Sequence, residues 1–175
     1  MSGDAGLVSS NTPSQALFTP PRMTLGNLLS VDQIVPEMRS TERWSAIVEL
    51  VDTLVKSGGV APGDRDAVLA SLRAREETMS TGIGFGIAIP HASSDRVSKV
   101  VAVFGRSEHG IDFDSLDNAP VRFIVMFVVP KDHFQIHLRT LAAIAKFLND
   151  RGVRERLGRA SSPQEILGIF ESPGR

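Results

Sequence analysis

One segment restricts the fold of this chain more than any other, and it spans residues 80–92. It reads Ser-Thr-Gly-Ile-Gly-Phe-Gly-Ile-Ala-Ile-Pro-His-Ala, with three glycines in five residues that let the backbone bend and approach a ligand closely. Residues 87–89 are apolar and predict a short buried strand, which Pro90 ends because proline has no backbone N–H. His91 is therefore expected directly after a strand end, facing solvent or a partner. The spacing fits an ordinary loop histidine equally well.

The rest of the chain alternates helices and strands with short connections. Apolar residues at helical spacing predict one helix that opens near residues 40–41 and closes at 58–59, and a second that starts near residue 64. The β-branched runs at 100–104 and 121–129 predict strands covered on both faces, with a short strand at 110–113 and a turn at 117–120 between them. Further helices are expected at 134–148, 153–157 and 163–170. This order predicts an α/β fold: a single layered domain, with a mixed β-sheet flanked by helices on both faces.

Composition excludes several classes of function. The chain has 175 residues, which suits one domain with a substantial core. A net charge of −1 without a basic stripe argues against nucleic acid as a partner, and no apolar run is long enough to embed the chain in a membrane. The absence of cysteine excludes thiol catalysis and disulfides, and it fits a cytoplasmic protein. Residues 1–22 read as a flexible N-terminal tail rather than a signal peptide, and residues 172–175 as a C-terminal tail.

Arg75 is the first candidate for a binding role. Helical spacing turns it toward the same face as the apolar Val68 and Leu72. A cation on an inward face needs an anionic partner. That partner is either Glu76, in a structural ion pair, or a phosphate, which a guanidinium grips with two parallel N–H groups. The pattern by itself leaves both interpretations open.

His137 shares a helix face with Leu141, Ile144 and Leu148, so we expect it to point toward the sheet. It is either a site residue or a histidine at the edge of the core, bonded to a backbone carbonyl. His133 lies one turn earlier, but no glutamate stands between the two histidines as in a zinc-protease helix, and no third ligand is evident nearby. The sequence therefore predicts no metal site, and it indicates no cofactor.

Three motifs in order carry a family resemblance: Arg75-Glu76, the Gly-Ile-Ala-Ile-Pro-His segment that ends at His91, and His137-Leu138 before a Leu/Ala-rich helix. Over residues 23–171 the chain resembles the enzyme IIA domain of the fructose/mannitol type (type 2) of the bacterial sugar phosphotransferase system. The resemblance implies that His91 carries a phosphoryl group, with Arg75 beside it. It also implies that His137 donates a hydrogen bond to the phosphoryl oxygens. The donor would be a small histidine phosphocarrier protein.

Phosphoryl transfer has a loose transition state, so a protein mainly positions groups and balances the charge on the equatorial oxygens. A neutral imidazole suffices as the nucleophile near pH 7. The predicted site combines the catalytic His91, Arg75 and His137 with loop and backbone groups at Thr81, Gly82, Ala92, Ser93 and Ser94, and with Glu76 as a supporting residue.

The sequence allows more than one role for the phosphoryl group after it reaches His91. The segment 23–29 before the first helix makes the chain resemble the nitrogen-regulatory branch of the family, whose members regulate a protein partner according to their phosphorylation state. The alternative is a sugar-permease component that passes phosphate to a separate IIB domain. A third possibility is a partner-binding domain that is never phosphorylated. A nucleotide-binding loop at residues 82–86 is disfavoured, because the glycines precede a strand and the third comes one residue early. Phe85 in this loop is either a partner contact or an inward side chain.

Overall fold

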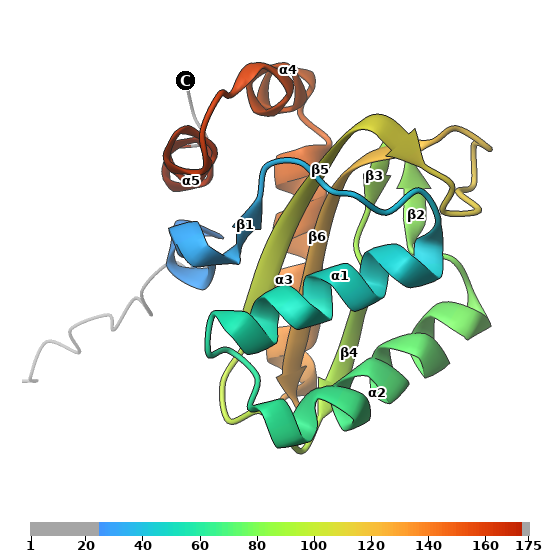
Figure 1. Ribbon diagram of the computed structural model, residues 1–175, viewed down its shortest axis with the longest axis vertical. Helices are drawn as coiled ribbons and strands as arrows, with labels where there is room; N and C mark the ends of the chain where they lie inside the picture. The colour runs from blue at the N-terminus through green and yellow to red at the C-terminus, as the bar shows by residue number, and fades with distance from the viewer. Residues whose placement is uncertain (1–24, 173–175) are drawn as a thin grey trace, which may run out of the picture.

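The computed structural model describes residues 25–172. The predicted tail at 1–22 and residues 173–175 lie outside the described residues. None of the helices within the described range has the length and apolar character needed to cross a bilayer. The described elements begin with short 3-10 turns and a two-residue strand and end with three consecutive helices (Figure 1). The strands are β1 (Ile34–Val35), β2 (Gly82–Gly84), β3 (Ile87–Ala88), β4 (His91–Ser94), β5 (Val101–Ile111) and β6 (Val121–Pro130). The α-helices are α1 (Arg43–Lys56), α2 (Arg65–Thr78), α3 (Phe134–Leu148), α4 (Arg151–Arg159) and α5 (Pro163–Glu171).

The six strands form one mixed sheet in the order β1-β5-β6-β3-β2, with β4 also paired to β6. The long strands β5 and β6 are antiparallel, whereas β1 pairs with β5, and β3 and β4 pair with β6, in parallel. Nearly every residue of β6 is buried, as expected of a continuous apolar run in a strand with both faces covered. The predicted α/β fold with a mixed sheet is therefore confirmed.

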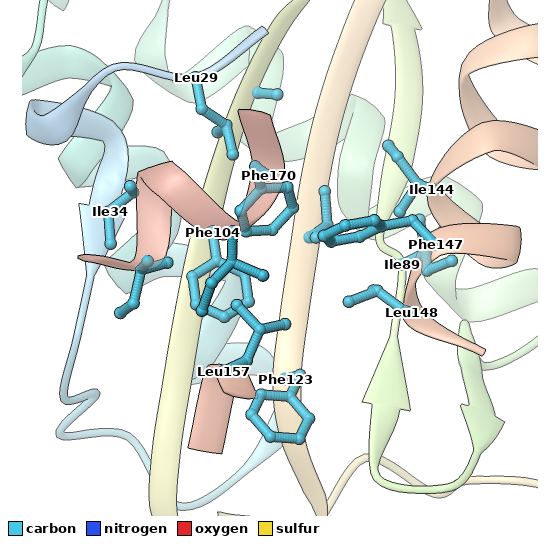
Figure 2. Packing of buried hydrophobic residues seen from close by; sticks show 14 of the residues in the cluster. Leu29, Ile34, Ile89, Phe104, Phe123, Ile144, Phe147, Leu148, Leu157 and Phe170 are labelled. Atoms are coloured by element: carbon cyan, nitrogen blue, oxygen red, sulfur yellow. The ribbon is translucent and has the colours of Figure 1, made fainter. Parts of the chain in front are cut away.

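A hydrophobic core lies on each face of the sheet, and different helices cover the two faces (Figure 1). Helices α1 and α2 cover one face, where Leu50, Leu54, Val68 and Leu72 are buried. On the other face, residues from α3, α4 and α5 pack against β5 and β6 (Figure 2). Phe104 of β5 meets Phe170 of α5 there, with ring centroids 5.2 Å apart. The two cores hold α2 and α3 on opposite sides of the same sheet.

The helix boundaries follow local hydrogen bonds. Helix α1 starts after Glu42, whose carboxylate accepts the backbone N–H groups of Trp44 and Ser45 and so caps the first turn. The predicted start near residues 40–41 is early, because the Ser40 hydroxyl instead donates to Glu49 at 2.7 Å. Helix α4 is longer than the predicted 153–157, because the Asp150 side chain caps it at residue 151.

Two sequence predictions about strands need correction. The short strand expected at 110–113 is not separate, since β5 runs on to Ile111 and pairs there with Val121. Strand β3 does end before Pro90, as predicted, but His91 does not lie in a loop, because strand β4 begins directly after Pro90. Residues on both sides of it pair with β6 in the same parallel register, and the Pro90 carbonyl accepts the Phe127 N–H at 3.1 Å. Proline lacks only the donor, so its carbonyl still joins the ladder and His91 opens β4.

Candidate functional site

His91 is a buried histidine, only 6% exposed, at the first position of β4. Its ring stacks on Phe127 of the neighbouring strand, with centroids 5.3 Å apart and an interplanar angle of 11°. Its Nδ1 atom lies 2.8 Å from the carbonyl oxygen of Ile89. A carbonyl oxygen can only accept, so Nδ1 carries the hydrogen and donates it. The lone pair of the neutral ring therefore resides on Nε2.

The surroundings of His91 keep its ring neutral. The pKa of His91 is lowered from 6.5 to about 4, chiefly by burial. The hydrogen bond to Ile89 opposes this shift, and the nearby Arg75 and His137 contribute to it. At neutral pH the imidazole is uncharged, which leaves Nε2 as a nucleophile.

His137 lies in the first part of α3 and faces His91. The two rings meet edge to face, with centroids 4.8 Å apart and an angle of 75° between their planes. The centroid of the Phe127 ring lies 5.8 Å from that of His137. The side chain thus points at the sheet, as helical spacing predicted. Burial lowers the pKa of His137 too, and the Arg75 charge adds to the effect. Both histidines are consequently neutral groups beside one cation.

Arg75 supplies that cation from α2. Its Nη1 donates to the Met79 carbonyl at 2.9 Å and to the Thr78 hydroxyl at 3.3 Å, at the C-terminal end of the helix. The structure does not pair Arg75 with Glu76, which was one of the two partners that the sequence allowed. The Glu76 carboxylate instead lies 3.8 Å from the Arg43 guanidinium.

These side chains meet in a hollow of about 330 Å³ on the edge strand β4. Because α2 and α3 cover opposite faces, Arg75 and His137 reach the hollow from opposite sides of the sheet edge. Since the Pro90 carbonyl faces β6, strand alternation turns the backbone N–H groups of His91 and Ser93 away from that strand. The hollow therefore offers a neutral nucleophile, a guanidinium, a second imidazole and backbone donors. Its lining residues are Ser71, Arg75, His91, Ala92, Ser93 and His137.

A sequence model of one protein family matches most of the chain. The family is described as "Phosphoenolpyruvate-dependent sugar phosphotransferase system, EIIA 2", and the match covers residues 27–172. The chain belongs to this family. The resemblance drawn from the three motifs is thereby confirmed, and the chain is an EIIA 2 domain of a phosphotransfer system.

Individual relatives come from both branches of the EIIA 2 family. The "PTS system fructose-specific EIIA component" of Haloferax volcanii is 45% identical over 146 residues, which are 83% of this chain and 94% of the relative. The crystal structure of nitrogen regulatory protein IIA-Ntr from Neisseria meningitidis superposes with a TM-score of 0.76 at 29% identity, covering 83% of this chain and 98% of the other. The complex of enzyme IIAMTL with phosphorylated IIBMTL from Escherichia coli gives a TM-score of 0.69 at 25% identity, covering 81% and 96%.

Three residues predicted for the phosphate site of this EIIA 2 domain do not line the hollow. Thr81 lies behind it, where its N–H and hydroxyl both donate to Glu76. Gly82 packs against Ser115 so closely that a Cβ at this position would overlap the Ser115 side chain. The Ser94 hydroxyl turns back to accept the N–H of Arg96 at 3.1 Å. The contacts of these three residues are thus with neighbouring parts of the fold, and they do not face the hollow.

Sequence reasoning missed Ser71. It precedes Arg75 by one helical turn and lines the same hollow, with its hydroxyl donating to the Ala67 carbonyl at 3.2 Å. The only available signal was its i,i+4 spacing from Arg75.

His133 and Phe85 lie apart from the hollow. His133 is an exposed residue at the start of α3, and within residues 25–172 no three His, Cys, Asp or Glu side chains gather as a metal site would require. Phe85 is 69% exposed at a positive φ of 56°, in the turn between β2 and β3. The guanidinium of Arg154 lies 5.3 Å from its ring centroid. The inward alternative for Phe85 is therefore wrong, and the ring stands on the surface.

Proposed function

We propose that this chain carries a phosphoryl group on Nε2 of His91. The observation that carries the proposal is the bond from His91 Nδ1 to the Ile89 carbonyl, because it leaves Nε2 as the free nucleophilic nitrogen of a neutral ring. His91 also lines the hollow that contains Arg75 and His137.

The proposed step is a transfer between two nitrogen atoms. The Nε2 lone pair of His91 bonds to the phosphorus held on the donor histidine, and the P–N bond of the donor breaks with its electron pair returning to the donor ring. The His91 ring then bears a substituent on both nitrogens and is positively charged, so its Nδ1–H bond to Ile89 strengthens. Arg75 and the outward N–H of Ser93 offset the charge on the phosphoryl oxygens, and His137 donates to one of them.

A histidine phosphocarrier protein is the proposed donor and a separate IIB domain the proposed acceptor. Support for the acceptor comes from the solved complex of IIAMTL with phosphorylated IIBMTL, a relative at 25% identity. The 45% identity to a fructose-specific EIIA component favours delivery to a sugar. This reaction would take place in the cytoplasm.

A regulatory role is the second candidate. It is favoured by the TM-score of 0.76 to the nitrogen regulatory protein of Neisseria meningitidis, against 0.69 for IIAMTL. In this role the phosphorylation state of His91 would govern the binding of a protein partner.

The test is phosphorylation by purified general phosphotransferase proteins and phosphoenolpyruvate, measured by intact mass. We expect a gain of one phosphoryl group that is labile to acid and stable to base. His91→Ala should abolish the gain, whereas His133→Ala, a matched control at an exposed histidine, should keep it. Undiminished labelling of His91→Ala would refute the proposal.

The destination is tested by adding a purified fructose-type IIB domain to the phosphorylated protein. Loss of the phosphoryl group to IIB and then to fructose supports the sugar branch. A phosphorylated protein that IIB leaves untouched, together with a stable partner that binds only one phosphorylation state, supports the regulatory branch.

A further inference from the structure

Glu76 is a buried carboxylate next to the site but outside the hollow. It is 1% exposed on α2. One of its oxygens accepts the Thr81 backbone N–H at 3.0 Å, and the other accepts the Thr81 hydroxyl at 2.7 Å. A buried carboxylate is stable only with such donors, and both come from one residue in the chain that leaves α2.

The hydrogen bonds continue from Thr81 to His91. The Thr81 carbonyl accepts the Ile89 N–H at 3.1 Å, and the Ile89 carbonyl accepts His91 Nδ1 at 2.8 Å. The Glu76 carboxylate is thus joined to the imidazole through two short connections, Thr81 and Ile89.

The segment between β3 and β4 is bonded on both sides, since the Pro90 carbonyl accepts the Phe127 N–H of β6 at 3.1 Å. Ile89 and Pro90 lie outside both strands, and Pro90 has no N–H. The Ile89 N–H is bonded to Thr81 rather than to the neighbouring strand β6. The direction of the Ile89 carbonyl therefore depends on two restraints, the bond to Thr81 on one side and the bond of Pro90 to Phe127 on the other.

We propose that Glu76 and Thr81 are positioning residues, which hold the Ile89 carbonyl against Nδ1 of His91 and thereby keep the reactive lone pair on Nε2. This inference rests on the function proposed above. Glu76 directly follows Arg75 on α2, so this helix contributes both the cation of the hollow and the carboxylate that holds Thr81 behind it. We call the bonded pair of Glu76 and Thr81 the clamp.

The test uses conservative variants of the clamp. Thr81→Val removes the hydroxyl at nearly constant volume, and Thr81→Ser restores it. Glu76→Gln replaces one accepting oxygen by a donor. The matched control is Glu49→Gln, because Glu49 clamps a different loop in the same way. It accepts the backbone N–H groups of Arg39 and Ser40 and the Ser40 hydroxyl, and none of these bonds leads to His91.

The decisive measurement is ¹⁵N NMR of the His91 ring in the unphosphorylated protein at pH 7, which reports the tautomer without any transfer reaction. We expect a ring protonated on Nδ1 in the parent, and a mixture of tautomers in Thr81→Val and Glu76→Gln. Phosphorylation of these two variants should be about tenfold slower, the effect of one ordinary hydrogen bond. Thr81→Ser should recover both the spectrum and the rate, and Glu49→Gln should change neither.

Parent-like ring spectra in Thr81→Val and Glu76→Gln would overturn the inference, and so would an equal change in Glu49→Gln, since that would mean general loosening. If Glu76→Gln does not fold, the comparison of Thr81→Val with Thr81→Ser decides whether the inference holds. Failure of the proposed function is recognised separately, because the parent would then take up no phosphoryl group whatever its ring spectrum shows.

Discussion

The imidazole of His91 lies nearly parallel to the ring of Phe127, with an angle of 11° between the two planes. Phe127 is fully buried and belongs to the core beneath α3, so the candidate nucleophile rests on the hydrophobic core itself. Burial is also the largest cause of the low pKa of His91. The packing that orients the ring is therefore part of the same environment that keeps it neutral.

This burial predicts how stability depends on pH. The folded protein keeps His91 neutral down to about pH 4, whereas the unfolded chain protonates it near 6.5. The unfolded state binds the extra proton between these values, so the stabilising effect is complete above pH 6.5 and is lost as the pH falls toward 4. Between pH 7.5 and 5, the parent should lose about 2 kcal/mol more free energy of unfolding than His91→Asn. Urea titrations at both pH values measure this, and equal losses would contradict it.

Arg75 and His137 are expected to assist transfer without accepting the phosphoryl group. Each charge-assisted hydrogen bond contributes about 1.5–3 kcal/mol, so Arg75→Ala and His137→Ala should each slow phosphorylation by roughly 10- to 100-fold. Rapid-quench measurements of phosphoryl uptake provide the rates.

The control for these variants is Arg73→Ala, which removes a cation from the same helix. Arg73 lies 5.8 Å from the ring centroid of Trp44, outside the residues that line the hollow. Its rate should match the parent. Parent-like rates in Arg75→Ala and His137→Ala would leave both residues with structural roles only.

Gly82 is expected to be required for packing. Its backbone lies so close to Ser115 that an added Cβ would overlap the Ser115 hydroxyl and come within 3.0 Å of the Ser115 Cα. Gly82→Ala should therefore lower the free energy of unfolding by about 1–3 kcal/mol. The buried Ser115 hydroxyl has no hydrogen-bond partner among the described residues, so Ser115→Ala should cost little.

A double-mutant cycle checks the Gly82 prediction. Because Ser115→Ala removes the overlapping oxygen, the double variant should be more stable than Gly82→Ala alone, as measured by urea denaturation. Strict additivity of the two changes would show that the close contact is not the cause.

Arg106 of β5 donates to three backbone carbonyls in two other segments and should be important for stability. Its Nε donates to the Pro36 carbonyl at 2.9 Å, and its Nη1 donates to the carbonyls of Leu157 and Ala160 at 2.7 and 2.6 Å. Arg106→Ala leaves these acceptors without their donor, so it should destabilise the fold by about 3 kcal/mol. Arg122→Ala, at an exposed position of the neighbouring strand, is the control and should lie within about 0.5 kcal/mol of the parent. Thermal or urea unfolding that ranks the two variants equally would contradict the prediction.

Local patterns predicted much of the secondary structure. The α/β class, the strands at 100–104 and 121–129 and the helix at 134–148 follow from apolar periodicity, which reflects burial on one or both faces. Predicted strand boundaries were wrong where a pairing partner on the neighbouring strand determined them. Whether residues 110–111 extend β5 depends on Val121 across the sheet, and whether strand pairing resumes after Pro90 depends on Phe127. Neither partner is adjacent in sequence, so periodicity carries no signal about them.

For the candidate site, the sequence by itself determined which chemical groups are present: an arginine on an inward helix face, a histidine beside a proline, and a second histidine on a helix facing the sheet. The family resemblance implied that the three share a site, but only the tertiary structure decided that this site lies at the edge of β4, that Ser71 joins it, and that Glu76 bonds Thr81 instead of Arg75. The physical reason is that helical and strand periodicity assigns a residue to a face of its own element. Which faces come together, and which polar groups satisfy one another once buried, depends on packing between elements distant in sequence.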